Sequence, residues 1–406
     1  MGAGYAGTYT FQKLHKKFHG DARVSLTLIN RSNYFLSTPL LHEVATGSIS
    51  PENIIEPLRK ILRCTHEQFL LTDVKSISLL NKVVETFAGT VPYDYLVLAM
   101  GAETNYRGVP GARENTFTLK TLEDAIKLKN HFIEVFERAT LVAEGDLDAL
   151  LHFVIIGGGG VGVELAAEMA DFFYETFATY YPAKIISRVK ITIINSSDEL
   201  LLNFQRSIRT RSKQVLRQKG IEVRFGLQVT KIEPGKIYLN NNQVVKTGTI
   251  IWAAGVKPSS VPIDVVADLE KIDGRLVVNE YLQIPSFPNV FVLGDMAAFK
   301  NPGEPLPVPM LAQVAHRQSV GVARNVINLI EGWPVVPYVY RHFGDLVSLG
   351  NWMAAGELFG FKFFGHLAWF FWRGVYLSKL LSPAKQAKVL LDWFINLFLP
   401  RDISEL

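Results

Sequence analysis

The sequence predicts an α/β fold made of two similar strand–turn–helix halves and a helical C-terminal region. A GxGxxG pattern occurs twice, at positions 2–7 and 157–162, which are 155 positions apart. Each half also closes on an apolar strand that runs into a small-residue turn, at positions 93–102 and 248–258. Two such motifs in one chain are typical of two Rossmann-like dinucleotide-binding domains, because the glycines permit a tight turn and close backbone approach to a pyrophosphate.

The second motif has the complete local context that this interpretation requires. An apolar strand at 152–156 precedes it, and a helical pattern that begins near Val163 follows it. The N-terminus of that helix would face the phosphates of a bound dinucleotide. The residues expected to contact the nucleotide are Gly157, Gly159, Gly160, Val161 and Gly162, together with Ala254 and Gly255 of the closing turn.

The first motif has its helix but lacks the preceding strand, since only Met1 stands before Gly2. We therefore expect the first strand of this domain to be missing from the chain. The next strand is predicted at 24–29. The residues expected to hold the first nucleotide are Gly2, Ala3, Gly4, Tyr5, Ala6 and Gly7, with Ala99 and Gly101 of the closing turn.

These patterns divide the chain into four predicted segments. Residues 1–112 form the first part of one nucleotide-binding domain, and residues 263–340 form its second part. Residues 113–262 form the other nucleotide-binding domain. Residues 341–406, which are aromatic, glycine-rich and basic, form a C-terminal region.

Composition excludes several classes of protein. The single cysteine, Cys64, excludes a disulfide framework and a cysteine metal cluster, and it indicates a reducing compartment; no metal site is predicted. A formal net charge of +4 is too small to indicate nucleic-acid binding. No window reaches about 18 uncharged apolar residues, so no membrane-spanning helix is predicted.

Four further segments, taken in order, resemble a known family. They are 30–34 with 39–47, Gly294-Asp295, the run Ala312–Gln318, and the aromatic basic tail. Together with the glycine motifs, they resemble the flavoproteins with two dinucleotide-binding domains, and most nearly the type II, non-proton-pumping NADH dehydrogenases. The run Ala312–Gln318 is the most specific, because it is similar to the AQxAxxQ signature on the quinone side of that family.

The resemblance implies an NADH:quinone oxidoreductase in which hydride passes from NADH to FAD and two electrons then pass to a membrane quinone, without proton pumping. It places Asp295 on the ribityl chain of FAD and the segment Thr38, Pro39 and Leu40 along the flavin ring. The remaining FAD contacts that it implies are Asn30, Arg31, Gln313 and Val314.

For the quinone, the resemblance implies Gln313, because amide side chains can hydrogen-bond carbonyl oxygens. In many relatives a second glutamine falls four residues after the first; here that position is Arg317, and the glutamine, Gln318, comes one residue later. We therefore expect quinone contacts from Gln313, Arg317 and Gln318, with a structural role for Gln318 and a surface ion pair for Arg317 left open.

Two acids on the second predicted helix are catalytic candidates. Glu164 and Glu168 are four residues apart and thus share a helix face. One of them is expected to face the nicotinamide, and the alternative is a solvated helix face. Asn195 stands where the family usually has an acid that binds the ribose, so repulsion of a 2′-phosphate is lost. NADH is the predicted substrate, with NADPH as the alternative.

The tail carries a predicted amphipathic helix. From Phe361 to Leu406 there are six Lys or Arg residues against three acids. Two apolar stripes at helical spacing, Val389–Trp393–Leu397 and Leu390–Phe394–Phe398, lie beside a polar stripe of Lys388, Asp392 and Asn396. This pattern, with the aromatic run 367–372, predicts helices that lie on a membrane surface; packing in a core or a homodimer is the alternative.

The function expected is therefore a peripheral enzyme on the cytoplasmic face of a membrane. The main alternative is a soluble FAD-dependent NAD(P)H reductase that passes electrons to a protein partner. A disulfide or sulfide:quinone reductase would need redox cysteines beside the flavin, and Cys64 alone does not supply them. A non-enzymatic nucleotide-binding protein is a further alternative.

Overall fold

The computed structural model describes residues 1–61, 67–264 and 269–406, and Cys64 lies outside them. The chain divides into two compact units. The first comprises 1–35, 56–103 and 256–342; the second comprises 36–55, 104–255 and 343–406. The first unit contains most of the two predicted parts of one nucleotide-binding domain, but residues 36–55 and 104–112 of the predicted first part fall in the second unit. The C-terminal region from residue 343 onward also packs within the second unit. Within the described ranges, no helix has both the length and the apolar character to cross a bilayer.

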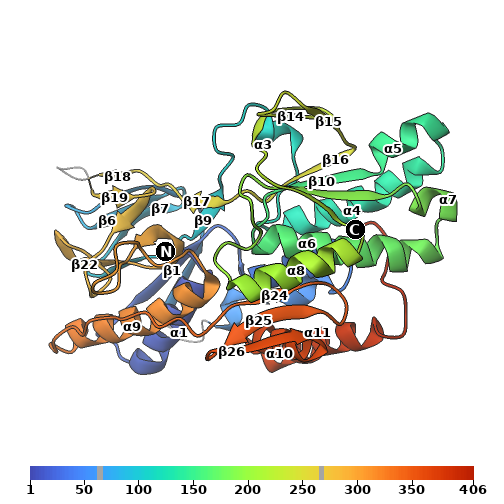
Figure 1. Ribbon diagram of the computed structural model, residues 1–406. Helices are drawn as coiled ribbons and strands as arrows, with labels where there is room; N and C mark the ends of the chain where they lie inside the picture. The colour runs from blue at the N-terminus through green and yellow to red at the C-terminus, as the bar shows by residue number, and fades with distance from the viewer. Residues whose placement is uncertain (62–66, 265–268) are drawn as a thin grey trace. The chain divides into compact units, whose positions relative to one another are not determined.

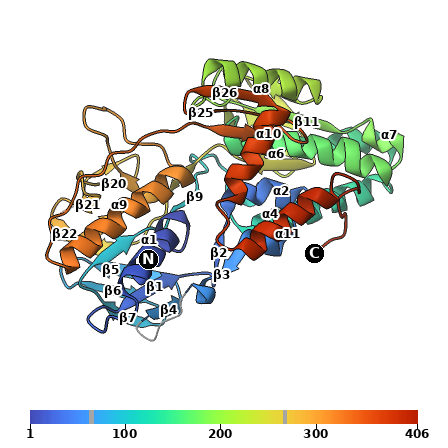
Figure 2. The same ribbon diagram turned by 90° about the horizontal axis from the view of Figure 1, so that it is seen from below.

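The first unit combines short parallel ladders with two long helices. The helices α1 (Tyr5–Phe18) and α9 (Ala312–Ile330) pack against each other, as Figures 1 and 2 show. The parallel pairs are β1 (Leu26–Asn30) with β4 (Glu67–Leu71), and β8 (Leu96–Leu98) with β22 (Phe287–Val292), to which β21 (Gln283–Ile284) adds antiparallel. A second sheet contains β18 (Ile263–Asp264), β5 (Val74–Ser78), β6 (Val83–Thr86) and β7 (Gly89–Pro92). A third contains β19 (Lys271–Ile272), β20 (Arg275–Val277) and β23 (Ala297–Ala298).

The two parallel ladders of this unit are separate, and the start of the chain lies hydrogen-bonded to both. The Met1 nitrogen donates to Val97 O at 2.8 Å, and Ala99 N donates to Met1 O at 2.9 Å. Gly2 N donates to Ile29 O at 2.8 Å. Met1 and Gly2 therefore lie between the two ladders, beside the glycine turn, where a central strand is expected.

The second unit is built on a parallel sheet of order β12–β11–β10–β16. Its strands are β10 (His152–Ile156), β11 (Lys190–Ile194), β12 (Glu222–Arg224) and β16 (Thr249–Trp252). The central strand β10 is buried at every position, as expected of a strand covered on both faces. The helices are α2 (Leu41–Ala45), α3 (Ala112–Asn115), α4 (Leu122–Ala139), α5 (Leu147–Leu150), α6 (Gly160–Asp171), α7 (Ala183–Ile186) and α8 (Arg206–Gln218). An antiparallel sheet of β13 (Val229–Glu233), β14 (Lys236–Leu239) and β15 (Val244–Lys246) completes this part.

Aromatic packing fixes α4 and α6 against this sheet. Phe132 and Phe136 of α4 contact Phe153 of β10 and Phe173, which follows α6, with ring centroids 4.6–6.2 Å apart among these four. All four side chains are fully buried. Aromatic rings supply large apolar area for burial, so this cluster holds α6, and with it the glycine turn at its start, on the sheet.

The C-terminal region adds an antiparallel sheet and two helices to the second unit. The strands are β24 (Leu346–Ser348), β25 (Ala354–Leu358) and β26 (Phe361–Gly365). The helices α10 (His366–Leu377) and α11 (Pro383–Ile395), drawn in red in Figures 1 and 2, pack on each other and on this unit. The Ser382 side chain caps α11 by accepting from Lys385 N, and Pro383 occupies its first turn.

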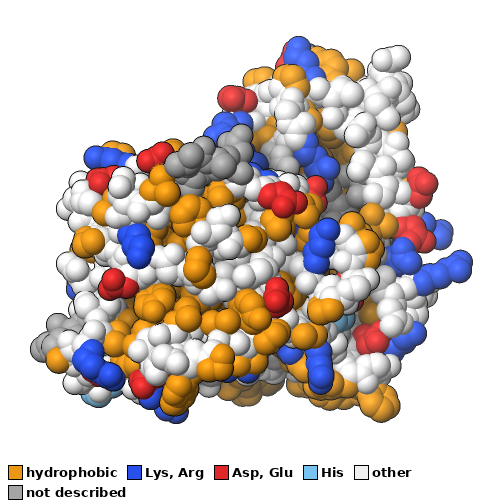
Figure 3. All heavy atoms as spheres, turned by 90° about the vertical axis from the view of Figure 1, so that its left-hand side faces the viewer, with side chains coloured by type: hydrophobic (Ala, Val, Ile, Leu, Met, Phe, Trp, Pro, Cys, Tyr) orange, Lys and Arg blue, Asp and Glu red, His pale blue; other side chains and the backbone are white. Residues whose placement is uncertain are grey.

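The face drawn in Figure 3 carries Lys or Arg and Asp or Glu side chains scattered among each other, with hydrophobic side chains gathered toward the lower part of the view. Charges of both signs mixed in this way produce no broad basic surface on that face, which is consistent with the small net charge.

Candidate active site

The glycine turn of the first unit is closed by backbone contacts that only glycine permits. Gly2 has φ +86°, and a Cβ on Gly7 would lie 1.8 Å from Gly2 O. Helix α1 begins at Tyr5, directly after Gly4. A Cβ at Gly4 would meet no atom within 4 Å, so the space in front of the helix N-terminus is open. Exposed N–H groups at a helix start suit a phosphate.

Asn30, at the end of β1, stabilises this turn through hydrogen bonds. Its Oδ1 accepts from Ala3 N at 3.0 Å, and its Nδ2 donates to the carbonyl oxygen and the hydroxyl of Ser32 at 2.8 and 2.9 Å. The neighbouring Arg31 is exposed. The Asn30 amide is thus already engaged within the protein.

The second unit repeats this arrangement. Gly157 has φ +116°, and a Cβ on Gly162 would lie 2.0 Å from Gly157 O. Asn195, directly after β11, accepts from Gly158 N at 3.0 Å and donates to Ser197 O and Glu199 O, both at 2.9 Å. We call Asn30 and Asn195 the latch asparagines.

The remaining residues predicted around the second turn also lie beside it. Helix α6 begins at Gly160, and a Cβ on Gly159 or Gly160 would find open space. Arg107 Nε donates to Ala254 O at 2.7 Å, and Gly255 has φ +126°. Ala253 N donates to Ile156 O, which joins the closing turn to the strand that carries the glycine motif.

In the first unit, the predicted residues Asp295, Gln313, Val314, Arg317 and Gln318 lie at or near one turn. A Cβ on Gly294 would contact Ala6 Cβ and Ala315 Cβ, each at 3.4 Å, so the end of β22, the start of α1 and α9 meet here. Asp295, Gln313 and Arg317 are partly exposed, whereas Val314 is buried. Gln318 is fully buried: its Oε1 accepts from Gly294 N at 2.6 Å, and its Nε2 lacks a partner among the described residues.

The predicted flavin segment falls in the second unit. Thr38, Pro39 and Leu40 form the 3-10 turn η1 (Thr38–Leu40), which leads directly into α2. Thr38 and Pro39 are partly exposed, and Leu40 is fully buried in the core of that unit.

The two acids of α6 do share a face, and the C-terminal region covers that face. Glu164 Oε1 accepts from Ser348 N at 3.0 Å and from Trp372 Nε1 at 3.2 Å. Glu168 Oε2 pairs with Arg401 Nη2 at 2.9 Å, and only 2% of Glu168 is exposed. The expected alternative of a solvated helix face is therefore wrong for Glu168, because the residue is buried with an ion-pair partner from the chain terminus.

Burial sets the protonation of this face. Burial raises the pKa of Glu164 to about 8, against the donors from Ser348 and Trp372 that lower it. Burial also acts to raise the pKa of Glu168, but the positive charge of Arg401 chiefly brings it below its ordinary value. Asp171, one turn further along, has a pKa raised to about 6 by burial, although it pairs with Lys219 and accepts from Asn351 N at 2.6 Å.

Glu43 of α2 joins the same cluster, and the sequence did not single it out. It is buried, its Oε2 accepts from Trp393 Nε1 at 2.5 Å, and burial raises its pKa to about 7. Arg373 lies between the rings of Trp369 and Trp393, 3.8 and 4.4 Å from their centroids. The available signal was a charged residue within otherwise apolar helical stretches, which applies to both Glu43 and Arg373.

The sequence pattern did not specify which side of the tail helix faces the protein, and the hydrogen bonds of the polar stripe do. Asp392 Oδ2 accepts from Ser50 N at 2.9 Å and Asn53 Nδ2 at 2.8 Å, and Asn396 Nδ2 donates to Ser48 O at 2.7 Å. The polar stripe thus turns inward, apart from Lys388, which is exposed. One apolar stripe is also divided, since Val389 and Trp393 are buried and Leu397 is exposed.

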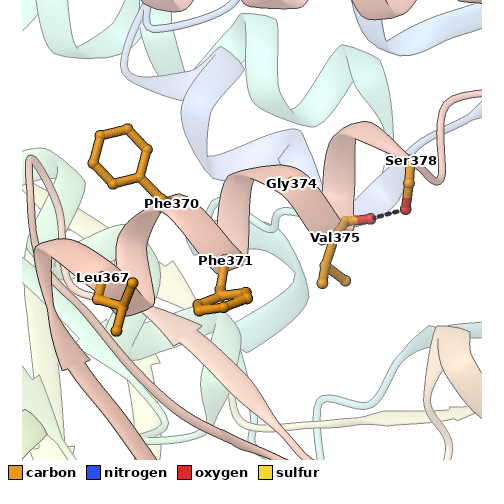
Figure 4. A pocket seen from close by; sticks show the side chains of 6 residues that line it. All are labelled: Leu367, Phe370, Phe371, Gly374, Val375 and Ser378. Atoms are coloured by element: carbon orange, nitrogen blue, oxygen red, sulfur yellow. Dashed lines mark hydrogen bonds between the residues drawn. The ribbon is translucent and has the colours of Figure 1, made fainter.

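The outward surface of the tail is apolar. On α10, an apolar groove is lined by Leu367, Phe370, Phe371, Gly374, Val375 and Ser378 (Figure 4). On α11 and just beyond it, the exposed apolar side chains include Leu390, Leu391, Phe394 and Phe398. The tip of the β25–β26 hairpin adds Phe359 and Phe361, which are 73% and 71% exposed. We call these three parts together the apolar tail face.

Comparison with known proteins identifies the family. Residues 1–319 match the pyridine nucleotide-disulphide oxidoreductase family, and residues 342–402 match the NDH2 C-terminal domain. A probable NADH dehydrogenase of Dictyostelium discoideum is 31% identical over 416 residues, covering 100% of this chain and 90% of that protein. A type II NADH:quinone oxidoreductase of Staphylococcus saprophyticus is 31% identical over 363 residues, covering 89% of each.

Solved structures share the fold. NDH2 from Plasmodium falciparum, in complex with NADH, superimposes with a TM-score of 0.91 at 21% identity, covering 99% of this chain and 98% of that one. The sulfide:quinone oxidoreductase of Aquifex aeolicus gives a TM-score of 0.73 at 20% identity, covering 98% and 94%. The chain therefore belongs to the pyridine nucleotide-disulphide oxidoreductase family, and within it to the type II NADH:quinone oxidoreductases, which oxidise NADH through FAD and reduce a quinone.

Proposed function

We propose that the first unit holds FAD on the turn Gly2–Gly7 and that the second unit holds NADH on the turn Gly157–Gly162. The observation that carries a dinucleotide site at each place is the repeated geometry of the two turns, and the order, FAD first and NADH second, is the one that the family resemblance implies. Each has a glycine that leaves no room for a Cβ, an open helix N-terminus and a latch asparagine. Open space before the helix start fits a pyrophosphate at both places. The flavin, when bound, accepts hydride equivalents and passes on electrons in pairs.

In the first unit, Asp295 and Gln313 are the side chains that would orient FAD and quinone. Both are partly exposed at the turn where α1, α9 and the end of β22 meet. Gln313 and Arg317 carry hydrogen-bond donors suited to quinone oxygens. Gln318 we assign to the support of this turn instead, because its amide is buried and holds Gly294 N.

In the second unit, Glu164 is the acid we assign to the nicotinamide side. It lies one turn into α6, the helix whose N-terminus forms the nucleotide turn, and it remains partly exposed. Glu168 we assign to holding the C-terminal region, because its carboxylate is committed to Arg401.

For the substrate, we propose NADH with tolerance of NADPH. Asn195 carries no charge that would repel a 2′-phosphate, and its amide is already engaged, because its Oδ1 accepts from Gly158 N and its Nδ2 donates to Ser197 O. The ribose would then meet Ser196, which is exposed, and Ser197, which is partly exposed.

We propose that the apolar tail face rests on a membrane surface. Its exposed Phe and Leu side chains come from a hairpin and two helices of one region, and Lys362 and Lys388 flank them. Large exposed aromatic patches beside basic residues suit the interface of a bilayer with anionic lipid. The single cysteine supports a reducing compartment, and thus the cytoplasmic face. A homodimer through the same face is the competing arrangement.

The test compares two electron acceptors. The double variant F370S/F394S removes two exposed rings, and F87S, whose ring is 73% exposed on the first unit, is the matched control. We expect the double variant to lose sedimentation with phosphatidylcholine–phosphatidylglycerol vesicles and activity toward a quinone dissolved in them. Its rate with a water-soluble quinone should be unchanged, and F87S should match the wild type throughout. A double variant that stays monomeric and still binds vesicles would contradict the membrane assignment, and a wild-type dimer that this variant dissociates would favour the homodimer.

A further inference from the structure

Helix α10 has two faces with different surroundings. Its outer face forms the groove of the apolar tail face, with Leu367 and Phe370 exposed (Figure 4). Its inner face carries Trp369 and Trp372, which are 4% and 1% exposed. This short helix therefore presents phenylalanine rings to the outside and tryptophan rings to the interior of the second unit.

The inner face contacts the acid that we assign to the nicotinamide. Trp372 Nε1 and Ser348 N both donate to Glu164 Oε1, at 3.2 and 3.0 Å. Both distances lie within the range of N–H···O hydrogen bonds. Two donors from different elements, α10 and β24, thus fix the same carboxylate oxygen.

The indole of Trp372 is itself held in place. The His42 ring packs against it at 5.6 Å between centroids and 70°, and the Tyr376 ring lies at 4.6 Å. Because the indole is buried between these rings, its N–H cannot turn to another acceptor without displacing them. Its hydrogen bond is directional and fixed.

Other ionisable groups surround this contact. Glu168 of α6 and Glu43 of α2 add negative charge near Glu164. Arg373 of α10 and Arg401 act on those two acids. Burial lowers the pKa of His42 to about 4, so this ring is neutral at pH 7. Burial and these like charges raise the pKa of Glu164, whereas a hydrogen-bond donor to its charged form lowers that pKa.

We propose that Trp372 holds the Glu164 carboxylate in position beside the nicotinamide of bound NADH, so that helix α10, which we assign to the membrane surface, also supports the nicotinamide site. This inference rests on the role proposed above for Glu164. Trp372 is a positioning residue, since it acts through Glu164 and not on the substrate. The sequence pattern did not indicate this contact, because the aromatic run 367–372 predicted a membrane surface, or packing in a core or a homodimer, without naming a partner for Trp372.

The experiment measures the rate of flavin reduction by NADH in the full-length holoenzyme between pH 5.5 and 9.5. W372F removes the donor and keeps an aromatic ring. The matched control is W393F, which removes a bond of the same kind, from Trp393 Nε1 to the carboxylate of Glu43, in the same region. E164Q and the double variant W372F/E164Q complete a cycle.

We expect W372F to move the pH profile to higher pH by roughly one pH unit, since the charged carboxylate loses a donor. W393F should not move the profile to higher pH, because a weaker negative charge on Glu43 can only lower the pKa of Glu164. The double variant should behave like E164Q. Equal profiles for W372F and wild type, or equal displacement in W372F and W393F, would overturn the inference. If W372F does not fold, W372H and W372H/E164Q replace W372F and W372F/E164Q in the cycle. An effect of W372H on the pH profile that persists in the E164Q background would also overturn the inference. An E164Q enzyme with the wild-type profile would instead show that the proposed role of Glu164 is wrong.

Discussion

Arg401 near the end of the chain should hold the C-terminal region on the second unit, and removing its charge should be costly. The guanidinium pairs with Glu168 at 2.9 Å and donates to Thr46 O and Asn351 Oδ1 at 3.3 and 3.2 Å. Arg401 and Glu168 are 5% and 2% exposed. Breaking such a buried pair by removing one partner costs about 3–5 kcal/mol, because the other charge remains buried. We expect R401M to lose that amount of unfolding free energy in urea.

The pH dependence of this loss has a definite sign. With Arg401 present, the pKa of Glu168 is below its ordinary value, so the ion pair stabilises at neutral pH and its contribution is lost as pH falls through that pKa. Without Arg401, burial raises the pKa of Glu168. At pH values above the ordinary pKa, Glu168 is then charged in the unfolded chain but disfavoured as a charge in the folded one. R401M should therefore be more destabilised at pH 8 than at pH 5.

Arg188 provides a matched control in the same unit. It pairs with Glu144 and Asp148, both at 3.0 Å, but it lies on the surface. Exposed pairs contribute little, so R188M should unfold like the wild type. The double variant R401M/E168Q should recover much of the stability lost in R401M. If R401M and R188M unfold alike, or if E168Q does not compensate, the interpretation of a buried lock is wrong.

Further predictions concern the nucleotide and quinone sites. N30A should purify with less FAD, as measured by flavin absorbance. N195D should keep its FAD and raise the ratio of kcat/KM for NADH over NADPH several-fold in steady-state kinetics, because a carboxylate repels a 2′-phosphate. An unchanged ratio would place selectivity elsewhere. Q313A should slow flavin reoxidation by quinone more than flavin reduction by NADH, and equal loss in stopped-flow measurements would place Gln313 in flavin binding. G162A should lower the melting temperature, since its Cβ would lie 2.0 Å from a backbone oxygen, whereas G159A should melt like the wild type and raise only the KM for NADH.

The sequence predicted well what depends on local pattern. The strand at 152–156, the glycine turn after it and the helix beyond are present as predicted, since a buried parallel strand and a glycine turn leave strong local marks. The shared face of Glu164 and Glu168 also follows from helix spacing alone. On α6, the side chains of both acids contact the C-terminal region.

The sequence did not predict what covers each face. The spacing of Asp392 and Asn396 gave a polar stripe, but its partners at Ser50 and Ser48 lie more than 340 positions earlier in the chain. Periodicity states which residues share a side of a helix, not which side meets the protein. The partners of Glu164 and Glu168 in the C-terminal region were hidden for the same reason.

Anaerobic reduction of the purified protein, followed by reoxidation, shows whether electrons pass from NADH through the flavin to a quinone. We expect a yellow protein whose flavin band is bleached by one equivalent of NADH per flavin and restored by a quinone. A bound flavin that neither NADH nor NADPH bleaches, or a reduced flavin that quinone does not reoxidise, would show that the protein does not carry out this reaction.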